Sequence, residues 1–364
     1  MYTKHKFFGL IFNVFSRLPV DESQVTFILN DKESFKGNFE AIKEELSKKN
    51  QFNYFYFNKN RPTVSSLKKL AKSKYVFLND NFLAMAFMNF NNDTVISQLW
   101  HAPGAFKKFG ASSSDSDEEM AMISKSNEKV NHLIISSDKI ASYYEDAFRI
   151  GRSKIRGLGT PRIDYYFRDN DVSELKKDFI KRYPQAENKK IILYAPTFRE
   201  NEEFNNVFDF LDLKKFNDSL SDEYVLALRL HPKFKDFCNK EMESDGEFID
   251  LTDYDNEQEL LLISDILITD YSSIMMEFAL LEKPTIFFTP DFDSYLNSER
   301  GFYFDFENVP GKIVFNDDEL IEAIENEDFG MEKIPDFLKT QFDQLDGKAS
   351  KRIVDYVLNN GEID

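Results

Sequence analysis

The chain has 364 residues, 42% of them hydrophobic, which is enough for two α/β domains that each bury a core. Its net charge of −18 offers no basic field to nucleic acid, and nucleic-acid recognition motifs are absent. A single cysteine, Cys238, excludes an internal disulfide, and four scattered histidines form no zinc-type cluster. We therefore expect no metal and a reducing cytoplasm as the compartment.

Residues 1–20 are predicted to form an amphipathic N-terminal helix. Between residues 4 and 18, phenylalanine, isoleucine and leucine recur at helical spacing, and the only formal charges are Lys4, Lys6 and Arg17. Two interpretations remain open. The helix either docks on the inner face of the cell membrane, as in a peripheral protein, or packs on the first domain. No apolar run reaches the roughly 18 to 20 residues that span a bilayer.

Residues 21–170 are predicted to form a first Rossmann-like domain, because strands and helices alternate there as in parallel βαβ units. The expected strands are VTFIL, FNYFYF, YVFLN, VISQLW and HLIISS, and the expected helices cover residues 38–48, 65–71, 116–125 and 139–148. The serine-rich and acidic run at 112–119 is predicted to be a loop. The segment IRGLGTPRIDYYF, in which glycine and proline break the pattern, ends this domain.

Residues 171–332 repeat the alternation, with strands KIILY, EYVLALRL, EFIDL, DILIT and PTIFF, and residues 333–364 read as C-terminal helices. The predicted fold class is α/β, with two Rossmann-like, doubly wound domains that face a cleft. Ligands of such sheets bind at the carboxyl ends of the strands. Four polar motifs of this chain follow predicted strands.

The stretch ILITDYSSIMMEFALLEKP reads as a strand that runs into a helix through a polar turn. It contributes the candidate phosphate-binding residues Thr269, Asp270, Ser272 and Ser273. A helix start offers unpaired N–H groups and a partial positive charge, which suit phosphate. Alternatively, the serines only cap the helix and Asp270 only tightens the turn. One helical turn on, Glu277 either binds ribose hydroxyls or faces solvent.

Two further motifs add histidine and lysine. In QLWHAPGAFKKFG, His101 meets a Pro-Gly turn, and a helix carrying Lys107 and Lys108 is predicted to follow. A histidine with an ordinary pKa can act as a general base at neutral pH, whereas the alternative is a hydrogen-bonded loop histidine. In LRLHPKF, Arg229, His231 and Lys233 alternate, so three potential cations would share one face and suit a di-anionic group.

The remaining motif, YAPTFRE, adds Thr197 and Arg199 to the candidate donor site. At the carboxyl ends of the strands, the sequence thus places two histidines, several cations and a helix start. Together these groups indicate a site for group transfer at a diphosphate. His5 and His132 have no other candidate site residues near them in the sequence, and they are interpreted as structural or surface residues.

In the order in which they occur, QLWHAPGAFKKFG, YAPTFR, LRLHP, ILITDYSSIMMEFALLEKPTIFF and RGFYFDF resemble the CDP-glycerol glycerophosphotransferase family of teichoic-acid and capsule synthesis. The resemblance covers residues 25 to 325 approximately. It implies a glycosyltransferase-B-like fold, in which the first domain binds the acceptor and the second binds a CDP-polyol. It further implies transfer of a polyol phosphate, with glycerol phosphate favoured, to a polymer or lipid-linked acceptor. No cofactor beyond the substrate is implied.

The resemblance also assigns roles to residues. His101 matches the proposed base, His231 matches a contact to the donor phosphates, and Ser272, Ser273 and Arg300 match donor-site positions. Trp100, Gly104, Lys107 and Lys108 fall on the acceptor side. The family form WHGTP is here His101-Ala102-Pro103-Gly104, a change that could alter how the acceptor lies. A nucleotide-sugar glycosyltransferase, a nucleotide-sugar epimerase and a non-catalytic polymer-binding protein remain alternatives.

Overall fold

The computed structural model describes residues 2–31, 33–199, 206–231, 248–298, 301–359 and 361–362. It divides the chain into two compact units, Met1–Arg168 with Thr340–Asp364 (unit 1) and Asp169–Lys339 (unit 2). The division after Arg168 falls next to the predicted boundary at residue 170. The C-terminal segment was expected as one separate part, but its final stretch from Thr340 belongs to unit 1.

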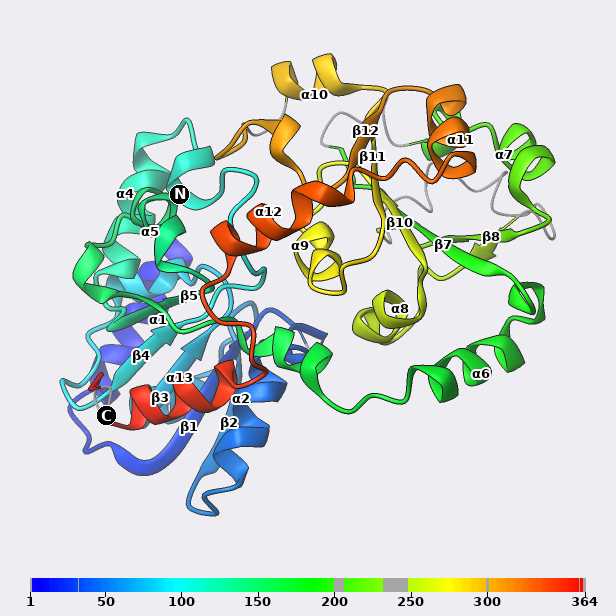
Figure 1. Cartoon of the computed structure of the whole chain (residues 1–364). Helices are drawn as coiled ribbons and strands as arrows, with labels where there is room; N and C mark the ends of the chain where they lie inside the picture. Colours follow the sequence, from blue (N-terminus) through cyan, green and yellow to red (C-terminus); the bar gives the residue numbers. More distant parts are fainter. Residues whose placement is uncertain are drawn as a thin grey trace. The chain divides into compact units, whose positions relative to one another are not determined.

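Unit 1 contains a six-stranded sheet in the order β2-β1-β3-β4-β5-β6, in which neighbouring strands run parallel (Figure 1). Its strands are β1 (Asp21–Leu29), β2 (Asn53–Asn58), β3 (Ser73–Leu78), β4 (Val95–Gln98), β5 (His132–Ile135) and β6 (Ile155–Gly157). Its helices are α1 (Thr3–Phe15), α2 (Asn38–Ser47), α3 (Val64–Ala71), α4 (Asp117–Asn127), α5 (Ala141–Phe148) and α13 (Ala349–Leu358). The C-terminal helix α13 lies beside α2 (Figure 1).

Unit 2 contains a second six-stranded parallel sheet in the order β12-β11-β10-β7-β8-β9. Its strands are β7 (Lys190–Ala195), β8 (Tyr224–Leu228), β9 (Ile249–Asp250), β10 (Ile266–Thr269), β11 (Thr285–Phe288) and β12 (Lys312–Val314). Its helices are α6 (Val172–Arg182), α7 (Leu213–Leu220), α8 (Glu257–Ile263), α9 (Ile274–Ala279), α10 (Phe292–Ser298), α11 (Asp317–Glu325) and α12 (Ile334–Gln341), the last of which crosses the division between the units.

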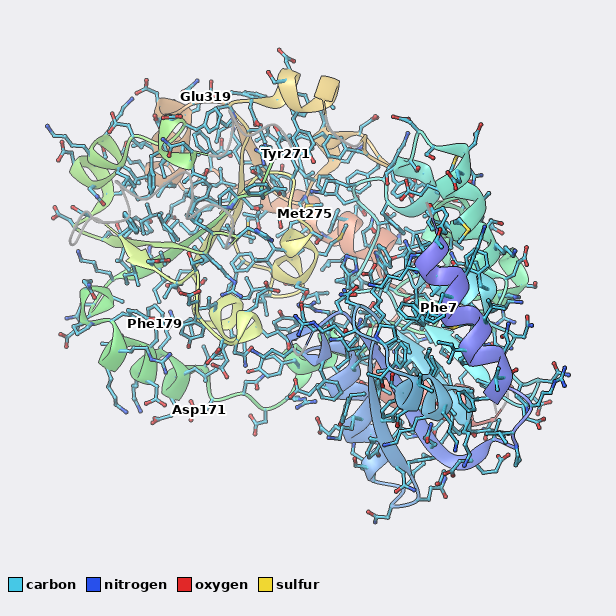
Figure 2. All side chains as sticks on the ribbon, turned by 180° about the vertical axis from the view of Figure 1, so that it is seen from behind. Phe7, Asp171, Phe179, Tyr271, Met275 and Glu319 are labelled. Atoms are coloured by element: carbon cyan, nitrogen blue, oxygen red, sulfur yellow. The ribbon has the colours of Figure 1, made fainter. Side chains whose placement is uncertain are left out.

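Both cores are built from apolar strands covered by helices. In unit 1, the ring of Phe27 packs at 5.1 Å from Phe39 on α2 and at 5.7 Å from Phe77 on β3. Ile353 of α13 belongs to the same buried cluster. In unit 2 the central strands are buried along their length, and Tyr271, labelled in Figure 2, is fully buried as well. The two-domain α/β architecture predicted from the sequence is therefore confirmed.

Several predicted elements need correction. No helix follows the Pro-Gly turn, and residues 105–109 are irregular. The acidic run at 112–119 is not one loop, because a 3₁₀ turn, Gly110–Ser113, opens it and α4 begins at Asp117 with its N-cap hydroxyl from Ser116. The short strands β6 and β12 were not predicted, since a run of three residues gives no periodic signal.

Candidate active site

In both sheets, polar residues lie where the strand order reverses. In unit 2 the order reverses between β7 and β10, which run side by side, and Thr197 and Asp270 follow these strands. The backbone N–H of Thr197 donates to both carboxylate oxygens of Asp270, at 2.9 and 3.0 Å. Open parallel sheets bind ligands at such a point. The candidate phosphate site of unit 2 is built around this contact.

Arg199 lies at the centre of a buried ion-pair cluster. Its guanidinium is 2.8 Å from Asp270 and 2.8 Å from Asp291, and the three residues are 6%, 2% and 6% exposed. The Tyr271 hydroxyl donates to Asp291 at 3.1 Å, and the guanidinium stands over the Tyr271 ring. Desolvation lowers the pKa of Arg199, but the two carboxylates outweigh it and raise that pKa, so the guanidinium stays charged.

Two of the predicted ligands, Arg199 and Thr269, already have partners within the protein. Two buried carboxylates pair with the Arg199 guanidinium, and a contact of Arg199 with the donor phosphates stays a prediction. Thr269 is fully buried and donates to the Ala195 carbonyl at 2.7 Å, which joins β10 to β7. Asp270 braces the turn, the role that the sequence left open. Within the described part of the chain, the buried Thr197 hydroxyl has no hydrogen-bond partner, which leaves it for a ligand.

The helix after this turn is shorter than its apolar pattern predicts. It spans only Ile274–Ala279, and a turn follows with Glu282 at φ +52°. Ser273 occupies the N-cap position without a side-chain cap, whereas the Ser272 hydroxyl accepts the N–H of Ile274 at 3.3 Å. Six residues sum few peptide dipoles, so any phosphate here would depend on local N–H and hydroxyl donors. The two predicted serines are half-buried beside the turn.

Glu277 of α9 is buried, which excludes the solvent-facing alternative. A contact to ribose stays a prediction. Arg300, predicted to bind the donor, and Lys233, the third cation after β8, both lie outside the described residues.

The alternation predicted after β8 continues to the end of the described segment. Leu228 and Leu230 are buried, Arg229 is half-buried and His231 is exposed. The ring of His231 lies 5.6 Å from that of Phe198 in the turn after β7, so the two strand ends converge. Arg229 donates to two backbone carbonyls of the loop before α8, at 2.8 and 3.3 Å, and this fixes its orientation.

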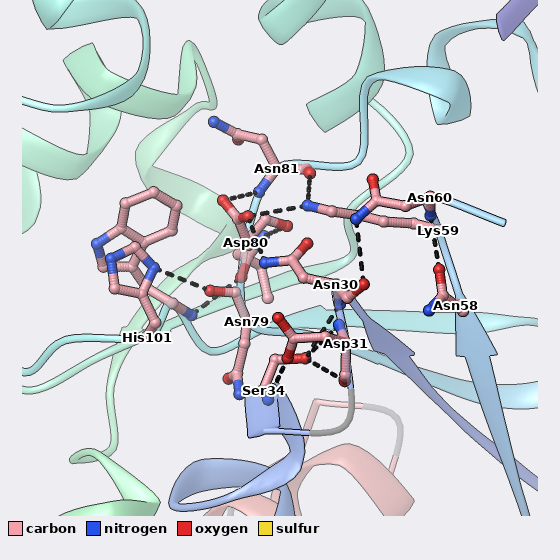
Figure 3. Close-up of polar contacts among 12 residues, drawn as sticks. Asn30, Asp31, Ser34, Asn58, Lys59, Asn60, Asn79, Asp80, Asn81 and His101 are labelled. Atoms are coloured by element: carbon pink, nitrogen blue, oxygen red, sulfur yellow. Dashed lines mark hydrogen bonds and ion pairs between the residues drawn. The ribbon is translucent and has the colours of Figure 1, made fainter. Parts of the chain in front are cut away.

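In unit 1 the strand order reverses between β1 and β3, and Asn30 and Asp80 follow these strands. The Asn30 amide donates to the Asp80 carboxylate at 3.0 Å, and Lys59, after β2, is 2.9 Å from the same carboxylate (Figure 3). Desolvation raises the pKa of Asp80, but Lys59 and hydrogen bonds from Asn30 and Asn81 outweigh it and lower that pKa. A fixed carboxylate therefore stands at this edge of the sheet.

His101 follows β4 at the same edge. Its Nδ1 lies 3.3 Å from the backbone carbonyl oxygen of Asn79 (Figure 3). Because a carbonyl only accepts, the neutral ring carries its proton on Nδ1 and leaves Nε2 as the acceptor. The ring keeps solvent contact but is partly desolvated, which lowers the pKa of His101, while Asp80 and the Asn79 carbonyl oppose this effect. A neutral imidazole at pH 7 is what a general base requires.

Trp100, just before His101, has a left-handed backbone with φ +59°. Its N–H donates to the Gln98 side chain at 2.9 Å, and its carbonyl accepts from the Asn38 amide at 2.6 Å. The indole ring is buried, 4.8 Å from the ring of Phe109. The indole ring also lies 4.2 Å from the imidazole of His101, so Trp100 contacts the candidate base through its side chain as well as through its backbone.

The other residues predicted on the acceptor side differ in accessibility. Gly104 is buried with φ +68°, its N–H donates to the Ser136 hydroxyl at 3.1 Å, and its carbonyl accepts from Tyr144 at 2.7 Å. These bonds hold the turn and occupy its backbone groups. Lys107 is half-buried and Lys108 is exposed, both on the irregular segment that replaces the predicted helix.

Sequence reasoning missed the polar residues that surround His101. Asn79 ends the predicted strand YVFLN, and Asp80 and Asn81 directly follow it, so the rule that found the other motifs could have found them. Asn38 gave no signal, because an asparagine at a helix start is ordinary. Asp291 gave none either, since its partner Arg199 lies 92 positions away.

Across the described ranges, no three His, Cys, Asp or Glu side chains converge on a position that could hold a metal ion. In the same residues, no helix has the length and hydropathy needed to cross a bilayer.

Comparison with known proteins gives consistent matches. The family model described as CDP-Glycerol:Poly(glycerophosphate) glycerophosphotransferase matches residues 10–359. The chain is 34% identical to the teichoic acid poly(ribitol-phosphate) polymerase of Bacillus spizizenii, over 96% of this chain and 58% of that protein. It is 31% identical to the teichoic acid ribitol-phosphate primase of the same organism, over 96% of this chain and 95% of the primase.

Among solved structures, the wall teichoic acid polymerase TagF superposes with a TM-score of 0.81 at 22% identity, over 98% of this chain and 94% of that one. This likeness establishes a glycosyltransferase-B-like fold. The chain spans less than two thirds of the polymerase from Bacillus spizizenii and nearly all of the primase.

Proposed function

The chain belongs to the CDP-glycerol:poly(glycerophosphate) glycerophosphotransferase family, and from this membership we propose that it transfers a polyol phosphate from a CDP-polyol to an acceptor hydroxyl. The acceptor is a cell-surface polymer or a lipid-linked precursor of teichoic acid, and CMP is released. The observation that carries the proposal is the family match over residues 10–359, which includes the His101 turn and the turn after β10. The relatives named above support the same reaction class.

In the proposed mechanism, unit 1 supplies the base and unit 2 holds the donor. Nε2 of His101 takes the proton of the acceptor hydroxyl, whose oxygen forms a bond to the polyol-linked phosphorus. The bond from this phosphorus to the bridging oxygen breaks, and CMP keeps the electron pair. His231 and Arg229, with the Ser272 turn, meet the charge that develops on the leaving group. A positioned base contributes about 10²- to 10⁴-fold.

The polyol is proposed from the relatives. The two Bacillus spizizenii relatives named above carry ribitol phosphate in their names, and this favours CDP-ribitol over the CDP-glycerol expected from the family resemblance. The direct test incubates the protein with CDP-ribitol, CDP-glycerol or a panel of nucleotide sugars, each with a lipid-linked acceptor, and identifies the nucleotide released. The proposal expects CMP. Release of a nucleoside diphosphate from a sugar nucleotide would instead support a glycosyltransferase, and no release from any donor would refute transfer.

We also propose that α1 contacts an anionic membrane surface, so that the enzyme works as a peripheral protein on the cytoplasmic side. One side of α1 packs on unit 1, where Phe12 is buried and the Asn13 amide donates to the Phe87 carbonyl. The other side leaves Phe7, Leu10 and Val14 exposed at 58%, 68% and 71% (Figure 2 labels Phe7). Exposed lysines on the same helix suit acidic lipid head groups.

Flotation with vesicles that contain phosphatidylglycerol tests this contact. The triple variant Phe7→Ser, Leu10→Ser, Val14→Ser should float less than wild type, while CMP release with a soluble acceptor persists. A matched control places serine at three exposed apolar positions elsewhere, Leu296, Phe315 and Leu345, and should float like wild type. Equal flotation of the α1 variant and the control would refute the contact.

A further inference from the structure

The most unusual backbone conformation near the candidate base belongs to Trp100. A bulky residue with φ +59° is an outlier, because its Cβ crowds the following carbonyl in the left-handed region. Such residues persist only where the surroundings over-determine them, and they gather at functional sites. Since Trp100 precedes His101, its dihedral angles set the direction in which the imidazole leaves the chain.

Two buried amide side chains hold both backbone groups of Trp100. Gln98, 1% exposed, accepts the Trp100 N–H at 2.9 Å, and its own amide donates to the Asp80 carbonyl at 3.2 Å. Asn38, 2% exposed, donates to the Trp100 carbonyl at 2.6 Å and to the Asn79 side chain at 3.3 Å. The two side chains thereby tie the end of β4 to the turn that follows β3.

Asn38 also reaches a third segment. Its side-chain oxygen accepts the N–H of Arg162 at 2.9 Å, and the guanidinium of Arg162 donates to the His101 carbonyl at 3.2 Å. The backbone on both sides of the imidazole is therefore fixed from outside the turn. With Asn38 at the start of α2 and Gln98 in β4, the fixing groups come from the rigid parts of unit 1.

We propose that Asn38 and Gln98 are positioning residues, which hold Trp100 in its left-handed conformation and so direct Nδ1 of His101 to the Asn79 carbonyl. This inference rests on the proposed function, in which His101 is the base. When Nδ1–H donates to that carbonyl, Nε2 is the basic nitrogen and faces away from it. Loss of the Asn38 donor leaves a buried carbonyl unpaired and the left-handed backbone unsupported.

The first test replaces Asn38 by alanine and uses Asn127 as a matched control. Asn127 is also a buried amide that donates to the backbone carbonyl of an aromatic residue, Phe148, at 2.9 Å, but it has no bond to the His101 turn. Asn38→Ala should lower kcat by about 10- to 100-fold, the size expected for a base displaced by an ångström, with the KM for the CDP-polyol within about threefold. Asn127→Ala should keep kcat near wild type. Equal kcat values for the two variants would overturn the inference.

The second test separates hydrogen bonding from packing. Asn38→Asp fills the same volume and still accepts from Arg162, but a carboxylate cannot donate to the Trp100 carbonyl. Positioning by hydrogen bonds predicts a kcat as low as in Asn38→Ala. A kcat close to wild type would mean that Asn38 only fills space.

The third test does not depend on activity. In protein labelled with ¹⁵N in its histidine rings, the His101 signals should report the Nδ1–H tautomer, and Asn38→Ala should shift them toward a tautomer mixture. His101→Ala identifies the signals by their loss. If wild type released no CMP while this shift occurred, the proposed function would fail and the positioning would stand. An unchanged spectrum in the variant would overturn the positioning itself.

Discussion

At the scale of single residues, the charge of Asp80 next to His101 is the feature with a measurable consequence. Desolvation lowers the pKa of His101, and Asp80 is the strongest group that raises it again. The carboxylate is held by Lys59 and Asn30 and cannot swing away without losing both contacts. The acid limb of kcat/KM, which reports the free enzyme, should therefore lie below the ordinary histidine pKa of about 6.5.

Asp80→Asn tests this coupling. The substitution removes the charge that raises the pKa of His101 and leaves Lys59, which lowers it, unneutralised. The acid limb of kcat/KM should move to lower pH than in wild type, because the imidazole stays neutral further into the acid range. A pH–rate profile of both proteins measures the shift. An unmoved limb, or one moved to higher pH, would contradict the assignment of His101 as the titrating base.

The candidate site residues differ in how much of their role could be predicted from neighbouring residues in the sequence. His101, His231 and the serines after Asp270 could be found because each follows a predicted strand within one short motif. The charge of Arg199 is visible in YAPTFRE, but its ion pair could not be predicted, since its partner Asp291 is remote in sequence. The left-handed Trp100 could not be predicted, because the clamp that imposes it includes Asn38, far from it in the chain.

At the scale of elements, the Arg199 cluster joins the turns after β7, β10 and β11. Arg199→Met would leave Asp270 and Asp291 buried without a cation, and such a loss costs about 3 to 5 kcal/mol of stability. The urea concentration at the midpoint of unfolding of unit 2 should therefore fall. Lys215→Met, which breaks an exposed pair with Asp318 in the same unit, serves as the control and should change the transition little. Equal shifts in the two variants would contradict the bracing role.

The packing of α13 on β5 should depend on pH through His132. Desolvation, with Arg156 and Lys154, lowers the pKa of His132 to about 4, and its ring lies 4.8 Å from that of Tyr356 on α13. In the unfolded chain, His132 binds its proton near pH 6.5. The contribution of neutral, buried His132 to the free energy of unfolding is therefore complete above pH 6.5 and is lost as the pH falls toward 4.

His132→Phe keeps a ring against Tyr356 but cannot take up a proton. The variant should lose less stability than wild type between pH 6.5 and 4, as measured by thermal unfolding across that range. An equal loss of stability in the two proteins between pH 6.5 and 4 would show that other groups cause the acid instability.

At the scale of the whole molecule, the alternation of strand and helix periods was sufficient to predict two doubly wound domains, because buried parallel strands and amphipathic helices leave distinct local patterns. It could not predict that Thr340–Asp364 returns to unit 1, since the burial of α13 depends on a surface formed by α2 and distant strands. The prediction of a helix after Gly104 was wrong, because hydrogen bonds to Ser136 and Tyr144 fix an irregular turn there.

The central claim is that His101 is the base of a polyol-phosphate transfer that releases CMP. The most direct measurement compares wild type with His101→Ala for CMP release from the CDP-polyol that wild type uses best, together with donor affinity by calorimetry. We predict a loss of CMP release of about 10²-fold or more with nearly unchanged donor affinity. CMP release by His101→Ala within about tenfold of wild type would contradict the claim.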